Sequence, residues 1–214
     1  MRQDVSQKKI VVLGATGATG RAVVAVALRA GHEVTALVRR PGSLAPADRL
    51  REVVWEDVAD AGALTEAFRS ARPDVVISAL GGADTGPTTV CADAMRSAVP
   101  AMTGSGVRRL IVVSAHGVLE THDRSLYSRA VWAGVGEKMK DKEAMEPLIT
   151  GSTLDWTIVR PPALKNTPPT GKYVVGEDLP IRLWHSIGRA DLAAFLVQEA
   201  ERADFVRRYP RIHR

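Results

Sequence analysis

The sequence contains a single cysteine, Cys91, among its 214 residues, so no disulfide can form within the chain. A chain without disulfides is typical of a reducing compartment. The first nine residues are polar and lack the apolar core of a signal peptide. No apolar run approaches the roughly 18 residues that a membrane-spanning helix needs. We therefore expect a cytoplasmic protein that does not associate with a membrane.

Two kinds of site are also missing from the sequence. The histidines, at positions 32, 116, 122, 185 and 213, do not follow the spacing of zinc ligands. No Gly-Lys-Ser or Gly-Lys-Thr follows the glycine-rich segment near the start of the chain, which argues against a phosphate-loop nucleoside triphosphatase. We expect neither a metal site nor nucleotide hydrolysis of that type.

The net charge of +5 comes mainly from the end of the chain. Between Arg202 and Arg214, five arginines stand against one aspartate, and the rest of the chain is close to neutral. A nucleic-acid contact or an acidic partner is one interpretation of this basic tail, residues 204–214. The tail has no repeated basic architecture, so we favour a solvated tail or a contact between subunits. We expect no nucleic-acid partner, and either a monomer or a small homo-oligomer.

Strand-length apolar runs alternate with helical patterns along most of the chain. Residues 9–13 are continuously apolar after Lys9, as expected for a parallel strand buried on both faces. The expected strands are 9–13, 32–38, 53–55, 74–78, 109–114 and 156–159. The expected helices are 21–30, 61–71, 89–102, 138–150 and 191–203. Pro100 is expected to kink or shorten the third helix.

This alternation predicts an α/β fold of Rossmann type, a doubly wound and mainly parallel sheet flanked by helices. No linker separates two cores, so we expect a single domain over residues 1–214, with a polar N-terminal tail at 1–8. Two stretches are less regular. Residues 116–136 are expected to form a loop with a short helix, and residues 172–175 a hairpin.

A glycine-rich loop lies directly between the first expected strand and the first expected helix. Gly14 permits a tight turn, Gly17 lets backbone N–H groups approach a diphosphate, and Gly20 lets the helix pack close to the strand. The start of the helix carries partial positive charge and unpaired donors, which attract phosphate groups. The expected cofactor contacts here are Gly14, Thr16, Gly17, Ala18, Thr19 and Gly20. The alternative is a glycine-rich turn that binds no ligand.

The residues after the second strand indicate which dinucleotide would bind. A site for NAD places a carboxylate about 20 residues beyond the loop, where it accepts a hydrogen bond from the ribose 2′-hydroxyl. This chain has Arg39 and Arg40 there. Two guanidinium groups suit the 2′-phosphate of NADP, so we expect NADPH to be preferred over NADH. The alternative is that both arginines are solvated turn residues.

Several short motifs occur in the order in which they stand in one known family. They are Gly14-Ala15-Thr16-Gly17-Ala18-Thr19-Gly20, Leu37-Val38-Arg39-Arg40, Glu56-Asp57-Val58, Ser78-Ala79-Leu80-Gly81, Ser114-Ala115, Asp155-Trp156-Thr157-Ile158-Val159-Arg160-Pro161-Pro162 and Arg189-Ala190-Asp191-Leu192-Ala193. With them the chain resembles atypical short-chain dehydrogenase/reductases of the NAD(P)-binding, NmrA-like group, and among these most closely the biliverdin reductase B type of flavin reductase. The likeness extends from about Lys9 to Ala203.

The resemblance implies cofactor contacts at the carboxyl ends of four further strands, where open α/β sheets bind ligands. It implies that Asp57 and Val58 contact the adenine, and that Ala79, Leu80 and Gly81 line the adenosine and ribose side. It also implies that Ser114 and Ala115 lie beside the nicotinamide ribose. The last group would hold the carboxamide through backbone groups and consists of Pro161, Pro162, Ala163 and Leu164. For Asp57, a helix N-cap or a turn is an equally good interpretation.

The resemblance is incomplete where the family's proton donor would stand. Many short-chain dehydrogenases use Tyr-x-x-x-Lys, whereas this chain has Lys138 at the tyrosine position and Lys142 at the lysine position. Tyr127 cannot replace the tyrosine, because Val131 lies four residues further on. The remaining catalytic candidates are Ser114, Lys142 and His116, with His116 as a general acid. The alternatives are a cofactor contact for Ser114, a solvated charge for Lys142 and a plain loop residue for His116.

These observations favour an NADPH-dependent oxidoreductase that transfers a hydride to a planar conjugated small molecule, such as a flavin or a quinone. Solvent supplies the proton in such a reduction, so the missing tyrosine is compatible with it. The alternative is a regulatory protein of NmrA-like type that senses NADP(H) without catalysis. A sugar-nucleotide epimerase or dehydratase fits less well, because the C-terminal part is short and the tyrosine is missing.

Overall fold

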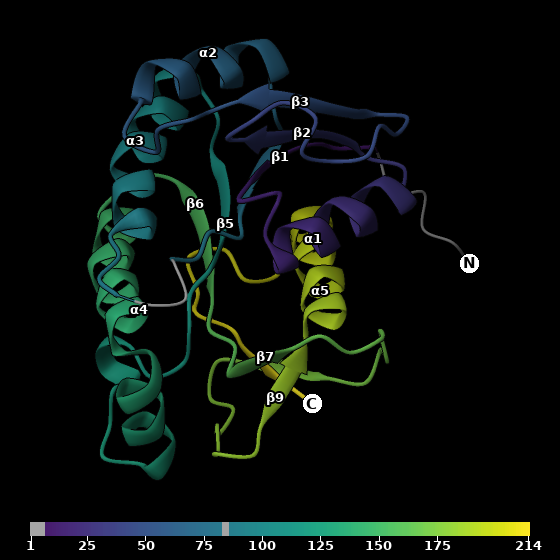
Figure 1. The fold of residues 1–214 in the computed structure, drawn as a ribbon. Helices are drawn as coiled ribbons and strands as arrows, with labels where there is room; N and C mark the ends of the chain where they lie inside the picture. Colours follow the sequence, from purple (N-terminus) through teal and green to yellow (C-terminus); the bar gives the residue numbers. More distant parts are fainter. Residues whose placement is uncertain (1–6, 83–85) are drawn as a thin grey trace.

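A parallel sheet of six strands forms the centre of the protein (Figure 1), in a computed structural model that describes residues 7–82 and 86–214. The strands are β1 (Lys9–Leu13), β2 (Glu33–Val38), β3 (Leu50–Val54), β4 (Val75–Ser78), β5 (Arg109–Val113) and β6 (Asp155–Val159). Their order in the sheet is β3-β2-β1-β4-β5-β6, and all five pairings are parallel. This is the strand order of a dinucleotide-binding Rossmann sheet, so the predicted fold class is confirmed.

Helices cover both faces of the sheet, as Figure 1 shows. The helices are α1 (Ala18–Arg29), α2 (Ala61–Ala71), α3 (Val90–Gly104), α4 (Leu126–Thr150) and α5 (Arg189–Arg202), with a short 3₁₀ helix at Leu119–Thr121. Helices α1 and α5 pack together on one face, and α2, α3 and α4 pack side by side on the other. Consecutive parallel strands joined through helices produce this three-layer arrangement.

The side chains of β1 show how the sequence divides the core between the two faces. Ile10 and Val12 pack with α1 and α5, whereas Val11 and Leu13 pack with α2, α3 and α4. Successive side chains of a strand point to opposite faces, so a strand covered by helices on both sides must be apolar throughout. All four side chains are at most 1% exposed.

Two expectations about the helices are wrong. The expectation of a loop at 116–136 is wrong in its second half, because α4 begins at Leu126, where the Ser125 hydroxyl caps the helix by accepting from the Ser128 N–H. Val135, between two glycines, has non-helical angles and interrupts this helix. In α3, the expected shortening at Pro100 is also wrong, because the helix continues to Gly104 with Ala101 and Met102 buried. Tertiary packing offsets the missing hydrogen bond there.

The end of the chain is part of the fold, so the expectation of a solvated basic tail at 204–214 is wrong. Residues 207–211 run beside β6 through hydrogen bonds and isolated bridges, and strand β10 (Arg211–His213) pairs with β8 (Val174–Gly176) in antiparallel orientation. Ile212 is fully buried. The expected hairpin at 172–175 is therefore a pairing with the chain terminus. Arginines alternating with apolar residues explain the error, since such a strand resembles a basic tail.

Short strands and the N-terminal residues complete the description. Strand β7 (Ala163–Lys165) pairs in parallel with β9 (Ser186–Gly188) beyond the carboxyl end of β6. Of the polar tail predicted at 1–8, residues 1–6 lie outside the described part of the chain. The Lys8 N–H donates to Nδ1 of the buried His32, whose Nε2 contacts the Glu201 carboxylate at 2.9 Å. His32 thus links the start of the sheet to the end of α5.

The turn from β1 into α1 depends on close approach at two of its glycines. Gly14 has a φ of +75°, and its backbone lies against Ala79 at the end of β4. A Cβ on Gly20 would lie 2.0 Å from the carbonyl oxygen of Gly14 and 2.8 Å from the Cα of Ala15. A Cβ on Gly17 would meet only the Gly14 oxygen at 3.4 Å, an ordinary contact. Gly14 and Gly20 are therefore required by the fold itself, and Gly17 is not.

We predict that Gly20→Ala lowers the thermal unfolding midpoint by more than 10 °C or abolishes folding, because the methyl group forces α1 away from β1. The matched variant Gly17→Ala keeps the midpoint within about 3 °C of the wild type. Thermal unfolding followed by circular dichroism compares the two. Equal midpoints for both variants would contradict the packing argument.

Candidate functional site

Two adjoining cavities lie at the carboxyl ends of β1, β2 and β4. The first, of about 520 Å³, is lined by Thr16, Arg39, Arg40, Ser43 and Glu56. The second, of about 440 Å³, is lined by Gly14, Thr16, Gly17, Leu37, Arg39, Trp55, Glu56, Asp57, Val58, Ala79, Leu80, Gly81, Gly82 and Val90. Strand order reverses between β1 and β4, which is where open α/β sheets bind ligands. The structure thus collects most of the predicted adenosine-side residues around one cleft.

The start of α1 faces this cleft without a side-chain cap. Gly17 occupies the N-cap position with φ −71° and ψ 164°, and it has no side chain to accept from the first-turn N–H groups. The backbone of Gly17 itself bonds to the Gly14 oxygen, which closes the turn. Because the first amides of a helix have no partner within the helix, those of Ala18, Thr19 and Gly20 remain available. A diphosphate satisfies such donors and interacts favourably with the helix dipole.

Three other helices have their first amides occupied by protein side chains. The Asp60 carboxylate accepts from the N–H of Ala63 at the start of α2. The Asp141 carboxylate accepts from both Cys91 and Ala92 at the start of α3, at 2.9 Å each. Ser125 caps α4. Helix α5 also begins at a glycine without a side-chain cap, Gly188, but that residue lines neither cavity. The uncapped start of α1, in contrast, lines the second cavity.

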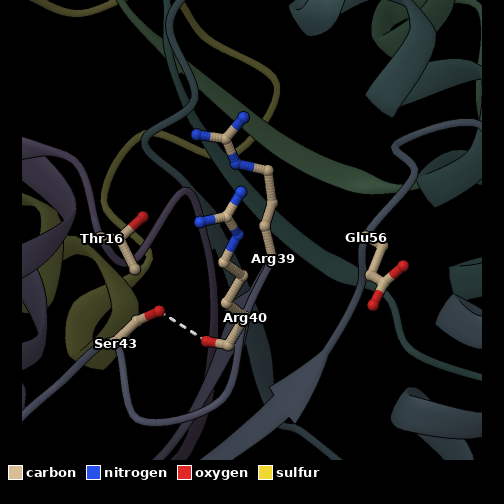
Figure 2. Close-up of a pocket in the computed structure, with 5 residues that line it drawn as sticks. All are labelled: Thr16, Arg39, Arg40, Ser43 and Glu56. Carbon is tan, nitrogen blue, oxygen red and sulfur yellow. Dashed lines mark hydrogen bonds between the residues drawn. The ribbon is translucent and has the colours of Figure 1, made fainter.

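Arg39 and Arg40 form the cationic side of the first cavity. Figure 2 shows their side chains extending in the same direction, with Thr16 on one side and Glu56 on the other. Both side chains are exposed, and neither forms an ion pair within residues 7–82 and 86–214. Two like charges beside each other repel unless an anion lies between them. The pair is therefore available to an anion, and its contact with a phosphate group stays a prediction.

Two residues that shape this cavity were not expected from the sequence. Arg21, in the first turns of α1, donates to the carbonyl oxygens of Thr16 and Ser43 at 2.9 and 3.0 Å. It ties the glycine loop to the loop after β2. The Ser43 hydroxyl donates to the Arg40 oxygen at 2.5 Å (Figure 2), and its oxygen lines the cavity. A serine three residues after an arginine carries no distinctive sequence signal, which is why Ser43 was not expected to line the cavity.

Asp57 forms a turn, one of the alternatives that the sequence left open, and its contact with the adenine stays a prediction. Its side chain lines the second cavity, and its carboxylate accepts from the Ala59 N–H at 2.9 Å in a tight turn. The helix cap is Asp60, three residues further on. The indole N–H of Trp55 donates to the Asp60 carbonyl oxygen, which fixes the ring in the wall of the cavity. The turn at residues 57–60 therefore also forms part of the wall of the second cavity.

The residues predicted at the nicotinamide end line neither of the two cavities. Ser114 follows β5, and its backbone N–H bonds to the Val159 oxygen of β6. The carbonyl oxygens of Pro161 and Leu164 already accept from His116 and Arg189. Ala115, Pro162 and Ala163 lie between these positions in the chain. The contacts proposed for this group with a carboxamide remain predictions.

Lys142 is buried and holds two strand ends together. Its Nζ donates to the Leu80 oxygen after β4 at 3.0 Å and to the Val113 oxygen at the end of β5 at 2.7 Å. An ammonium group has three N–H donors, and this one also forms a hydrogen bond with the side chain of Cys91. The solvated-charge interpretation is wrong, since the side chain belongs to the wall between β4 and β5. Asp141 beside it caps α3. These two residues therefore connect α4 to the start of α3 and to the ends of β4 and β5.

His116 is a buried neutral ring. Burial, together with the positive charge of Arg211, lowers the pKa of His116 to about 4, and its Nδ1 has no partner within the described residues. The ring lies 5.3 Å from that of Tyr127, and burial raises the pKa of that phenol to about 12. At neutral pH His116 carries no extra proton. Its environment therefore disfavours the general-acid role that the sequence suggested.

A second buried group, not found from the sequence, lies behind Ser114. The Ser114 hydroxyl contacts Glu146 of α4, and Glu146 in turn pairs with Arg160 at the end of β6. Glutamate in a helix and arginine before two prolines look like surface residues when considered separately. Their contact across α4 and β6 is visible only in the fold.

The described part of the chain contains neither a membrane-spanning helix nor a cluster of metal ligands. No helix there is both long enough and apolar enough to cross a membrane. In the same residues, no group of three or more histidine, cysteine or acidic side chains could hold a metal ion.

Comparison with known proteins agrees with this geometry. A family model described as NAD(P)H-binding matches residues 14–203. The sugar epimerase YhfK of Bacillus subtilis, itself uncharacterised, is 27% identical over 177 residues, which cover 80% of this chain and 79% of that protein.

Two solved structures share the fold at lower identity. The anaerobilin reductase ChuY of Escherichia coli O157:H7 has a TM-score of 0.81 and 24% identity, and the match covers 95% of each chain. A short-chain dehydrogenase/reductase of Veillonella parvula, solved in complex with NADP, has a TM-score of 0.78 and 20% identity over 97% of this chain and 94% of that one. The chain therefore belongs to the NAD(P)H-binding family, in agreement with the resemblance of its motifs to atypical short-chain dehydrogenase/reductases.

Proposed function

We propose that this protein is an NADPH-dependent reductase that transfers a hydride to a planar conjugated acceptor, such as a flavin or a quinone. The observation that carries the proposal is the pair of arginines, Arg39 and Arg40, beside the uncapped start of α1. The helix start suits the diphosphate, and the guanidinium pair suits a further phosphate on the adenosine ribose. Among nicotinamide dinucleotides, only NADP(H) has that phosphate.

The acceptor class is inferred from the residues at the positions where a proton donor was expected. Lys138 stands in place of the family tyrosine, Tyr127 has its pKa raised to about 12 by burial, and His116 is neutral. Reduction of an isolated carbonyl needs a proton at oxygen as the hydride arrives, whereas a conjugated ring spreads the added charge until solvent protonates it. The protein's part is to place the two rings in contact and to exclude competing reactions.

A basic tail free to bind a partner does not support the regulatory alternative, because residues 207–213 are packed against β6 and β8. A ligand-binding role without catalysis would still use the same cleft. Turnover measurements separate the two functions.

We predict that the purified protein oxidises NADPH at an increased rate when riboflavin, FMN or menadione is added. The absorbance at 340 nm measures the rate, and protein without acceptor is the control. Tight NADPH binding without stimulated oxidation, across flavins, quinones and linear tetrapyrroles, would contradict the reductase proposal and favour the regulatory alternative.

We predict that replacing both Arg39 and Arg40 with alanine weakens NADPH binding by at least 100-fold and NADH binding by less than threefold. Each charge-assisted phosphate contact contributes about 1.5–3 kcal/mol. Calorimetric titration gives both dissociation constants. The matched control replaces Arg29 and Arg69, two exposed arginines outside the cavities, and removes the same charge. Equal losses for NADPH and NADH would exclude a contact with the 2′-phosphate.

A further inference from the structure

The Ser114 hydroxyl lies 2.5 Å from a carboxylate oxygen of Glu146. Both residues are buried, Ser114 at 5% exposure and Glu146 at 0%. A carboxylate has only acceptor sites, so at this distance the serine must donate its single proton to Glu146. Its own two lone pairs remain. Within residues 7–82 and 86–214, no protein group donates to the Ser114 oxygen.

Arg160 forms a buried ion pair with Glu146. Its Nε and one terminal nitrogen donate to the two Glu146 oxygens at 3.2 and 2.5 Å, in a bidentate pair that is closed to solvent. The guanidinium also pairs with Glu120 and stacks on the ring of Tyr209, 4.2 Å from its centre. Burial alone would lower the pKa of Arg160, but hydrogen bonds to both glutamates outweigh it and raise that pKa. The charge that faces Glu146 is therefore permanent.

We propose that Glu146, held by Arg160, is a positioning residue that fixes Ser114 as a hydrogen-bond acceptor toward the nicotinamide end of the cleft. Ser114 follows β5 directly, at the carboxyl end of the sheet, which is the end at which the two cavities lie. Its proton points back to α4, and its lone pairs are left for a bound molecule. This inference rests on the proposed function, and it deepens it by giving the chemistry that the site recognises.

The consequence is a preference for hydrogen-bond donors. An N–H or O–H group can bond to the Ser114 oxygen, whereas a carbonyl oxygen facing it finds no proton. In the proposed reaction, two groups could donate to the Ser114 oxygen. One is a hydroxyl of the nicotinamide ribose, and the other is a ring N–H of the acceptor. Ser114 is accordingly not the proton donor of the reaction, and an acceptor with a ring N–H is favoured over one with carbonyl oxygens only.

The chain offers a matched control cluster at the opposite end of the same strands. Arg109 donates to Glu199 at 2.5 Å, and the Thr157 hydroxyl lies 3.1 Å from the same carboxylate. Arg109 begins β5, so this second group of guanidinium, carboxylate and hydroxyl lies at the amino end of the sheet, away from the cleft. Substitutions there report the cost of disturbing a buried pair without touching the site.

The test is a double-mutant cycle of Ser114→Ala and Glu146→Gln. In the glutamine variant, the amide oxygen stays with the terminal nitrogen of Arg160, and the amide N–H₂ takes the place of the oxygen that Ser114 and the Arg160 Nε both contact. The N–H₂ group then donates to Ser114, which turns the serine proton toward the cleft, and Arg160 loses one of its two hydrogen bonds to residue 146. The control cycle is Thr157→Val with Glu199→Gln. For each variant we would measure the thermal midpoint, the NADPH dissociation constant, and KM and kcat for lumiflavin and for 3-methyllumiflavin, which lacks the ring N–H.

We expect Glu146→Gln to raise either the NADPH dissociation constant or the KM for lumiflavin about 5- to 10-fold, and to have no such effect in the Ser114→Ala background. A change in the dissociation constant identifies the cofactor as the donor. A change in KM for lumiflavin but not for its methylated analogue identifies the acceptor. The control cycle is expected to lower thermal midpoints while both constants stay within twofold.

Three results would overturn the proposal. One is that Glu146→Gln leaves both constants unchanged. Another is that its effect persists in full when Ser114 is alanine, which is the behaviour of a purely structural residue. If Glu146→Gln does not fold, the test uses Ser114→Ala alone. An unchanged NADPH dissociation constant together with an unchanged KM for lumiflavin in that variant would then overturn the inference. If no acceptor is reduced, the proposed function fails, but the NADPH constants still test the role of Ser114.

Discussion

The structure depends on the close contact between the carbonyl oxygen of Gly14 and the Cα of Gly20. This contact lets α1 begin immediately beyond β1, and it places the uncapped amides of the helix at the point where the strand order reverses. Every other element of the cleft is positioned relative to that turn. Arg21 ties the turn to the loop that carries the two neighbouring arginines, and Ala79 packs against the backbone of Gly14.

Buried polar groups fix the opposite wall of the cleft. The middle of α4 contributes Asp141, Lys142 and Glu146, which bond respectively to the start of α3, to the ends of β4 and β5, and to Ser114 and Arg160. Burying such groups is costly unless each finds its partners, and here each has at least two. Helix α4 thus acts as a rigid support for the nicotinamide end, while α1 and the loop after β2 shape the adenosine end.

The sequence predicted the sheet, its buried strands and the glycine turn, because these follow from local patterns: apolar runs of strand length, and glycines at fixed spacing. It did not predict the first half of α4, whose two glycines and serines imitate a loop, or the packing of Ile212, whose arginine neighbours imitate a tail. The wall at the nicotinamide end was hidden for a related reason. Lys142 was named from family position alone, and Glu146 and Arg160 become partners only when α4 is laid across β6.

The central claim is that backbone amides at the start of α1 bind the diphosphate of a nicotinamide dinucleotide. The most direct measurement is calorimetric titration of NADPH into the wild type and into Gly17→Val, in which the extended backbone of residue 17 accepts a branched side chain but the new methyl groups cover the amides. We predict saturable heat for the wild type and none for the variant, at unchanged thermal midpoint. Absence of heat from the wild type with both NADPH and NADH, or equal binding by the variant, would contradict the account.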